Sequence, residues 1–355
     1  MPETRFRKPE DMVPLPWDRL ACHLRERGFR LSDQAPPRQF AGGMGNLNFL
    51  IELDGAPAVL RRPPLGPIPP GANDMKREHR VLSGLWQRFP LAPRAFFYCP
   101  DGEVIGAHFL IMEYREGTAV AGATLPEALA GDPDAARRLT TMLVEILADL
   151  HAVDPESVGL GALGRPVGFL DRAIEGWAKR AMIATDDAPG TVLLAVRDWL
   201  RANRVPDGPA ALVHNDYKLD NLLLDAETLT RPVAIVDWDQ ATRADALFDL
   251  ATLLSYWTED GDPRAMHDLA QMPTTQPGAL TRTEAAALYA RLSGRDLSDF
   301  GFHRVLAMYK LGVVFVQLHA QYRRGTVTDP RYAPFARIGN GILEFAHAVA
   351  HGEAS

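Results

Sequence analysis

One loop motif constrains this 355-residue chain more than any other feature of its sequence. The motif runs from His214 to Asn221 in the pattern H-x-D-x-x-x-x-N, and a short apolar segment ending at Asp237 follows it. In-line phosphoryl transfer needs a carboxylate that orients and deprotonates the attacking hydroxyl, and Asp216 fits this role. It also needs oxygen ligands for Mg²⁺, which Asn221 and Asp237 can supply. His214 is expected to hold the loop through hydrogen bonds of its ring.

The first motif alone is a modest signal. The motif fixes three residues, and each has a chance of about one in twenty at its position. Such a motif therefore occurs by chance in about one chain in twenty of this length. The context adds weight, because residues 211–213, 222–224 and 233–236 are apolar and indicate three short strands around the loop. Two carboxylates and an amide are then expected to converge from adjacent strand ends. The alternative is that these Asp and Asn residues only cap turns.

The N-terminal third shows the pattern of a small antiparallel sheet. Residues 40–53 predict a strand, a glycine-containing turn and a second strand, and residues 58–62 predict a third strand after a tight turn. Glycines let backbone N–H groups approach phosphate oxygens, so Gly43, Gly45 and Asn46 are candidate nucleotide-binding residues. Glycine-rich turns are also common in plain hairpins, and only the downstream motifs favour the nucleotide-binding interpretation.

Several further segments carry a family resemblance. They are residues 40–48, 59–64, 77–82, 150–154 and 168–170 with Trp177, and residues 309–325. With them, the chain resembles the aminoglycoside phosphotransferase and choline kinase superfamily, which shares a bilobal fold with protein kinases. It is most similar to the phosphotransferase domain that is fused to some acyl-CoA dehydrogenases and is free-standing in many bacteria. The resemblance implies an α+β fold, with a small antiparallel β-sheet N-lobe over residues 1–115 and a larger, mainly helical C-lobe over residues 116–355.

The resemblance also implies a nucleotide-binding N-lobe with one departure from the protein-kinase pattern. The position of the phosphate-binding lysine holds arginine, with Arg61 a better candidate than its neighbour Arg62. Arg61 should pair with Glu78 on a helix, although two solvated surface arginines are the alternative. Backbone groups near Glu113 and Tyr114 are expected to bind the adenine edge. ATP, or GTP in its place, would be the phosphate donor, together with Mg²⁺.

Two later segments complete the resemblance. Residues 244–251 are similar to the superfamily element G-D-P-x-x-D-L-A, although alanine replaces its Gly and Pro, and Asp249 is expected to anchor the catalytic loop. Asp239 has no secure role. The long helix expected over residues 302–324 would wall the acceptor pocket, and its apolar character suits a substrate with an apolar portion better than a polycationic aminoglycoside. The alternative is that most of this helix is core packing.

Composition excludes some other classes. The formal charge of −7 and scattered basic residues argue against a nucleic-acid partner. Residues 1–17 are charged and proline-rich, unlike a secretory signal, and no apolar run is long enough to span a membrane. Cys22 and Cys99 lack metal-ligand spacing and are expected to be free thiols in the cytoplasm.

The leading hypothesis is therefore a kinase that transfers a γ-phosphate from ATP or GTP to a hydroxyl group of a small molecule, such as a hydroxyacyl-CoA-like compound. The main alternative is a catalytically inactive nucleotide-binding module of the same fold, supported by arginine at position 61 and the altered turn at residues 244–246. A metal-dependent phosphohydrolase would explain the carboxylates. It would not explain the glycine turn, the Arg61 and Glu78 positions, or the segment that precedes Tyr114.

Overall fold

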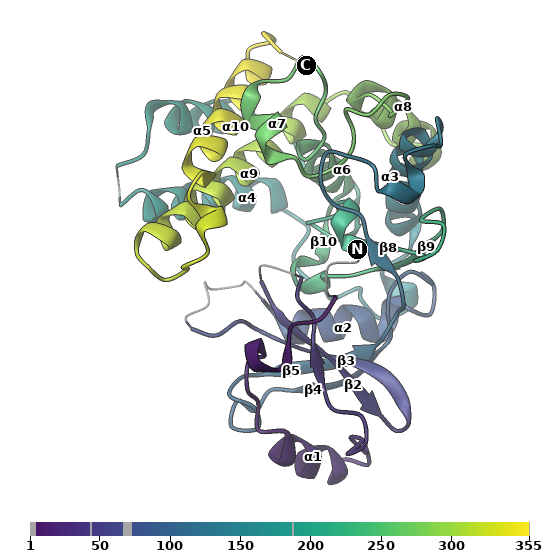
Figure 1. The fold of residues 1–355 in the computed structure, drawn as a ribbon. Coiled ribbons are helices and arrows are strands. Elements are labelled where there is room, and N and C mark those ends of the chain that lie inside the picture. Colours follow the sequence, from purple (N-terminus) through teal and green to yellow (C-terminus); the bar gives the residue numbers. More distant parts are fainter. Residues whose placement is uncertain (1–4, 43–44, 67–72, 187, 355) are drawn as a thin grey trace. The chain divides into compact units, whose positions relative to one another are not determined.

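The computed structural model describes residues 5–42, 45–66, 73–186 and 188–354, and its α+β fold is the class predicted from the sequence (Figure 1). The chain forms two compact units. The first comprises Met1–Gly117 and Val233–Ala241, and the second comprises Thr118–Pro232 and Thr242–Ser355. The resemblance implied one division of the chain, after residue 115. It did not include the return of residues 233–241 to the first unit. The chain returns because the N–H of Ile235 donates to the carbonyl of Leu91 at 2.7 Å.

The first unit is built on a five-stranded antiparallel sheet. A tight turn joins its second and third strands, and the positive φ angles of Asp54 (53°) and Gly55 (80°) are those that hairpin turns of this kind require. The strands, in their order across the sheet, are β1 (Arg38–Gln39), β2 (Leu47–Leu53), β3 (Ala56–Arg62), β5 (Phe109–Glu113) and β4 (Ala95–Cys99).

The two faces of this sheet have different roles. Successive side chains of a strand point to opposite faces. On β3, Ala58 and Leu60 join the apolar core that contains buried residues of α1 (Trp17–Arg25). Arg61 therefore points to the other face, where α2 (Met75–Leu85) packs on β4 and β5. The alternation of β3 thus presents one charged side chain to α2. The other elements of this part of the chain are η1 (Pro9–Asp11), β9 (Pro232–Ile235) and η5 (Trp238–Gln240).

The second unit is mainly helical. β7 pairs with β10 and β6 pairs with β8, both antiparallel, and the sheet that contains β6 and β8 has the strand order β6-β8-β9. The strands of this unit are β6 (Thr118–Ala119), β7 (Ala210–Val213), β8 (Leu222–Leu224) and β10 (Thr242–Asp245). Its α-helices are α3 (Ala135–Ala152), α4 (Phe169–Ala184), α5 (Thr191–Ala202), α6 (Ala246–Ser255), α7 (Arg264–Leu269), α8 (Arg282–Ser293), α9 (Phe300–Arg323) and α10 (Phe335–Ala350). Its short 3-10 helices are η2 (Glu127–Leu129), η3 (Glu156–Val158), η4 (Leu219–Asn221) and η6 (Pro330–Tyr332).

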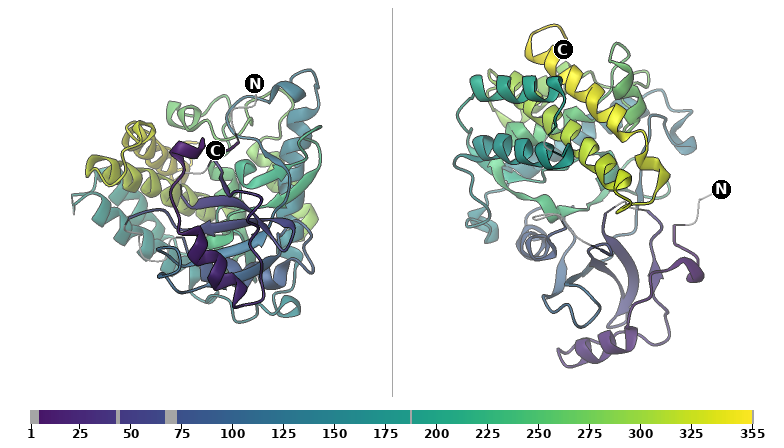
Figure 2. Two further views of the ribbon diagram at one scale, coloured as in Figure 1. Left: turned by 60° about the horizontal axis from the view of Figure 1, so that its bottom comes forward. Right: turned by 90° about the vertical axis from the view of Figure 1, so that its left-hand side faces the viewer.

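Helix α9 is the central element of this unit and packs against α4, α5, α6 and α10. It runs beside α10 at close range (Figure 2). A Cβ atom at Gly312 would lie 2.7 Å from Cγ of Leu343 and 3.0 Å from the carbonyl oxygen of Gly339. Residues 305–313 are all buried, so core packing, the alternative to a substrate-facing role, describes this part of the helix.

None of the helices in the described ranges combines the length and the apolar character that crossing a membrane requires. Even α9, with 24 residues, contains the buried charged side chain of Lys310 in its apolar middle section. A buried lysine is uncommon in a helix that serves only as core. Its surroundings therefore bear on the site.

Candidate functional site

The loop from His214 to Asn221 lies in the second unit, between β7 and β8, and α6 holds its backbone. Asp249 of α6 accepts two hydrogen bonds, from the backbone N–H of His214 and from that of Asn215, both at 2.7 Å. Nε2 of His151 lies 3.3 Å from the same carboxylate. Burial opposes ionisation of Asp249, but its bonds to His151 and the influence of His214 outweigh burial and lower its pKa. Asp249 thus has the anchoring contacts that the sequence predicted.

A second anchor, Lys310 of α9, was missed by the sequence analysis. Its Nζ donates to the backbone carbonyl of Asn215 and to Oδ1 of the same residue at 3.2 Å, and it lies 5.5 Å from the ring centroid of Phe248. Burial lowers the pKa of Lys310 although Asp216 and Asp249 act in the opposite direction. Asn215 has a left-handed backbone with φ of 66°. A single lysine within the apolar middle section of the helix was the available signal.

The carboxylate of Asp216 receives donors on both oxygens. The hydroxyl of Tyr256 donates to Oδ1 at 2.9 Å, and Nζ of Lys218 donates to Oδ2 at 3.3 Å. Burial alone would raise the pKa of Asp216, but Lys218, Lys310 and His214 lower it below the ordinary value. Asp216 is therefore an ionised carboxylate, the form that a general base requires. No signal in the sequence indicated Tyr256, which follows Asp216 by 40 positions.

Asn221 closes the same loop. Its Nδ2 donates to the backbone carbonyl of Asp216 at 2.9 Å. The amide nitrogen thus stabilises the loop, and the amide oxygen is the atom that a cation would bind. Asn221 belongs to the second unit and Asp237 to the first, so their joint role as metal ligands stays a prediction.

In the first unit, Arg61 is the centre of a buried charged group that we call the Arg61 cluster: Arg61, Glu78, Asp237, Asp239 and Asn46. Nε of Arg61 donates to Glu78 at 2.8 Å, and its second terminal nitrogen pairs with Asp237. Burial alone would lower the pKa of Arg61, but the carboxylates of Asp237 and Glu78 outweigh burial and raise it. The expected pair with Glu78 is therefore present.

The neighbouring arginine has a different environment. Arg62 donates through Nη1 to the backbone carbonyl of Ile105 at 2.7 Å, and burial lowers its pKa. Arg61 is 5% exposed and Arg62 is 4% exposed, so the alternative of two solvated surface arginines is wrong. Of the two, Arg61 is the one in contact with carboxylates.

Asp237 and Asp239 supply oxygen atoms to the Arg61 cluster. Asp237 has a left-handed backbone, with φ of 71°, and its side chain is 37% exposed. Asp239 is buried and accepts from Nδ2 of Asn46 at 3.4 Å. Burial, together with the charge of Asp237, raises the pKa of Asp239 to about 8. Asp239, which had no assigned role, is thus part of the cluster.

The donor atoms of this cluster fit a hard divalent cation. Carboxylate and amide oxygens are the ligands that Mg²⁺ takes, and Mg²⁺ keeps several of its own waters. Over the described ranges, no three His, Cys, Asp or Glu side chains form a group that could hold a metal by themselves. A magnesium ion at Asp237 would therefore depend on water and phosphate oxygens as well as on protein.

The structure describes only part of the predicted glycine turn. Gly43 lies outside the described residues. A Cβ atom at Gly45 would lie at an ordinary contact distance of 3.7 Å from Nδ2 of Asn73. The same nitrogen donates to Oδ1 of Asn46 at 2.8 Å, so the side chain of Asn46 connects Asn73 to Asp239. The contact of these residues with phosphate stays a prediction.

Glu113 ends β5, and Tyr114 follows it. The backbone N–H of Glu113 donates to the carbonyl of Arg94 at 2.8 Å, and its carboxylate pairs with Arg115 at 2.9 Å. The ring of Tyr114 stacks on that of Phe40 at a centroid distance of 6.5 Å. Because the N–H of Glu113 is already bonded, an adenine contact would fall on the other backbone groups of these two residues.

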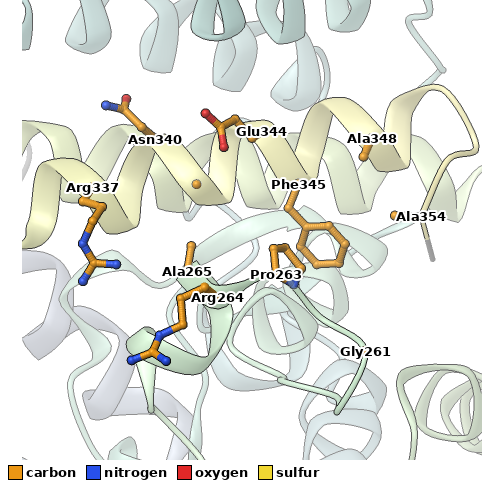
Figure 3. Close-up of a pocket in the computed structure, with 11 residues that line it drawn as sticks. Gly261, Pro263, Arg264, Ala265, Arg337, Asn340, Glu344, Phe345, Ala348 and Ala354 are labelled. Atoms are coloured by element: carbon orange, nitrogen blue, oxygen red, sulfur yellow. The ribbon is translucent and has the colours of Figure 1, made fainter.

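A hollow of about 740 Å³ lies between α7 and α10 (Figure 3). Arg264 and Arg337 line it, and both pair with Asp268, in the first case at 2.7 Å. No residue of the loop from His214 to Asn221 is among the residues that line it. The two arginines share the single carboxylate of Asp268, and none of the predicted site residues lines this hollow.

Comparison with known protein families gives one clear match. The model of the family described as "Phosphotransferase enzyme family" matches residues 37–288 of this chain. Acyl-CoA dehydrogenase family member 11 of Gallus gallus is 30% identical over 318 residues, which cover 86% of this chain and 39% of that protein. Probable acyl-CoA dehydrogenase IBR3 of Arabidopsis thaliana is 26% identical over 306 residues, covering 82% and 37%. The chain thus spans about two fifths of the length of these relatives.

Solved structures show the same fold. A Ralstonia eutropha JMP134 protein, provisionally classed as an aminoglycoside phosphotransferase, matches with a TM-score of 0.75, 22% identity and coverage of 96% of this chain and 99% of that one. A thermostable mutant of the aminoglycoside phosphotransferase APH(4)-Ia, in complex with AMP-PNP and hygromycin B, matches with a TM-score of 0.57, 17% identity and coverage of 94% and 99%. The protein-kinase-like fold class predicted from the sequence is confirmed.

Proposed function

Because the chain belongs to the phosphotransferase enzyme family, we propose that it transfers the γ-phosphate of ATP to a hydroxyl group of a small molecule, with GTP as the other candidate donor. The observation that carries the proposal is Asp216, a largely buried carboxylate with a lowered pKa in a loop held from two helices. A family member of known structure binds AMP-PNP together with the small molecule hygromycin B. We propose a nucleotide donor and a small-molecule acceptor for the present chain as well.

Asp216 would act as the base. An ionised carboxylate within hydrogen-bond distance of the acceptor hydroxyl can orient it and take its proton during the transfer. The backbone bonds of His214 and Asn215 to Asp249 keep the loop in one conformation, so His214 would act by holding the loop rather than on the substrate. Positioning of this kind is the main contribution of a protein to phosphoryl transfer.

The Arg61 cluster would hold the nucleotide. Arginine has five N–H donors. The bonds of Arg61 to Glu78, Asp237 and Asn48 use three of them, which leaves two for phosphate oxygens. Glu78 would orient Arg61, and the backbone near Gly45 and Asn46 would lie along the phosphates. The backbone near Glu113 and Tyr114 would contact the adenine ring.

Asn221 and Asp237 would hold Mg²⁺ through oxygen atoms. When bound, Mg²⁺ neutralises the charge that develops on the phosphates during transfer. The exposed fraction of Asp237, 37%, leaves its carboxylate within reach of a solute. Asp237 is also paired with Arg61, so a bound cation and the guanidinium would share this carboxylate.

For the acceptor, we propose an alcohol with an apolar portion, such as a hydroxyacyl-CoA-like compound. The curated relatives are named as acyl-CoA dehydrogenases, and the chain matches only part of their length. We also propose that the enzyme works in the reducing cytoplasm, where cysteines such as Cys22 and Cys99, both free in the described part of the chain, stay as thiols.

The alternative of an inactive nucleotide-binding module has one structural observation in its favour. Arg61 forms an ion pair with Asp237, the residue that a metal would require. The organisation around Asp216 counts against this alternative. Two helices hold the loop, and two side chains hold the carboxylate of Asp216. A module that only binds nucleotide would not need a base held in this way.

Calorimetric titration of Mg·ATP into the purified protein tests the proposed roles. We expect Asp237→Asn to weaken Mg²⁺-dependent binding by about tenfold or more, because a charged ligand is lost. Asp216→Asn should leave binding within about threefold, since the base acts on the acceptor. Asp33→Asn, a change of an exposed loop carboxylate, is the control. Wild-type protein that binds no nucleotide in a Mg²⁺-dependent way would overturn the proposal.

A further inference from the structure

The two oxygens of Asp216 are held by donors of different kinds. Lys218 is close to Oδ2, but its ammonium group also lies 3.5 Å from Asp220 and 5.3 Å from the ring centroid of Tyr256. An ammonium group is a point charge that can serve several acceptors at once. The bond from the hydroxyl of Tyr256 to Oδ1, at 2.9 Å, is directional. Of these two donors, the tyrosine is thus the one whose bond direction constrains the rotation of the carboxylate.

The side chain of Tyr256 is rigidly placed. It is the C-cap residue of α6, its backbone N–H bonds to the carbonyl of Leu253, and the whole residue is 9% exposed. The next residue, Trp257, donates through its ring nitrogen to the carbonyl of Leu280 at 2.8 Å. Burial and the neighbouring Asp216 raise the pKa of Tyr256 well above its ordinary value, so the phenol stays protonated and remains a donor.

Helix α6 acts on the loop at two positions. Asp249 holds the backbone of His214 and Asn215, and Tyr256 holds the side chain of Asp216. Tyr256 follows Asp249 by about two turns of helix, which places both residues on the same side of α6. Helix α6 thus contacts both the backbone of the loop and its carboxylate.

We propose that Tyr256 is a positioning residue that fixes the Asp216 carboxylate with Oδ1 engaged and Oδ2 directed at the acceptor hydroxyl. The proposal rests on the proposed function. In the transfer, Oδ2 takes the proton of the hydroxyl while the acceptor oxygen forms a bond to the γ-phosphorus. The bond between that phosphorus and the β–γ bridging oxygen breaks, and its electron pair leaves on the nucleoside diphosphate.

Tyr256→Phe tests this role, because it removes one hydroxyl and retains the ring. We expect kcat to fall by about tenfold to a hundredfold, the value of one hydrogen bond to a charged group. The KM values for nucleotide and acceptor should stay within about twofold, since Tyr256 acts on the base and not on binding. Tyr332→Phe is the matched control, because Tyr332 is also buried in the second unit and lies outside the loop and its anchors.

A second measurement does not depend on turnover. In protein that contains isotope-labelled aspartate, the carboxyl resonance of Asp216 is identified by its loss in Asp216→Asn. We expect this resonance to shift in Tyr256→Phe and to stay in place in Tyr332→Phe. An unmoved resonance overturns the inference even if the protein proves to have another activity. An unchanged kcat in Tyr256→Phe of an active enzyme overturns it while leaving the proposed phosphotransferase function intact.

Discussion

At the scale of single residues, the two predicted motifs each contain a strained backbone position. Asn215 and Asp237 have φ angles of 66° and 71°, which side chains other than glycine seldom adopt. Asn and Asp tolerate this conformation best. Such positions cost about 1–3 kcal/mol and persist where the surroundings determine them, often at functional sites. Around Asn215, those surroundings are the bonds to Asp249 and Lys310.

Lys310→Met tests the second of these anchors. The change removes the donor to the carbonyl of Asn215, and we expect kcat to fall by about tenfold or more as the loop loses its conformation. Thermal stability should change little, because removal of the buried charge offsets the loss of the hydrogen bonds from Lys310 to Asn215. Steady-state kinetics and thermal melts measure both effects, with Lys179→Met on the exposed face of α4 as the control. If kcat is unchanged in Lys310→Met, Lys310 does not hold the loop in its active conformation.

The sequence revealed some of these residues and not others for a physical reason. Asp216, Asn221 and Asp237 lie in two short motifs whose spacing reflects local chemistry, and Asp249 closely follows them. Tyr256 and Lys310 reach the loop from 40 and 95 positions later in the chain. Their roles depend on how α6 and α9 pack, and a single sequence does not contain that information.

At the scale of elements, the periodic segments were predicted best. Strands β2 and β3 and helices α2 and α9 all lie where the sequence indicated them, with end positions that differ by a few residues. The function of α9 was harder to predict. Its expected role as an acceptor wall conflicts with the burial of residues 305–313, which instead form core. Periodicity shows that a face is apolar but not what covers it.

The crossing of α9 and α10 provides a test of the packing. Gly312→Ala would place a methyl group 2.7 Å from Leu343, and we expect the free energy of unfolding to fall by about 1–3 kcal/mol from overpacking. In an exposed helix the same change stabilises by about 1 kcal/mol. Gly176→Ala in α4, where the added methyl meets nothing within 4 Å, should show that stabilising effect. Urea unfolding of both variants measures the two changes in the free energy of unfolding. If both changes have the same sign, they contradict the close approach of α9 and α10.

At the scale of the whole molecule, the chain assembles its charged groups by leaving one unit and returning to it. Residues 233–241 come late in the sequence, yet Asp237 and Asp239 belong to the first unit with Arg61 and Glu78. The sequence predicted these residues individually, in the order of a kinase-like chain. It did not predict the direct pair between Arg61 and Asp237, because a contact over 176 positions depends on the folded chain.

Phosphoryl transfer itself is the most direct measurement. Purified protein is incubated with Mg²⁺, ATP labelled in its γ-phosphate, and a panel of alcohols, sugars, aminoglycosides and hydroxyacyl-CoAs. We expect label on at least one hydroxyl acceptor, and a loss of about a hundredfold or more in the rate for Asp216→Asn. Protein that binds ATP but labels none of these acceptors, or an Asp216→Asn variant that labels one as fast as the wild type, would contradict the assignment of Asp216 as the base of a small-molecule phosphotransferase.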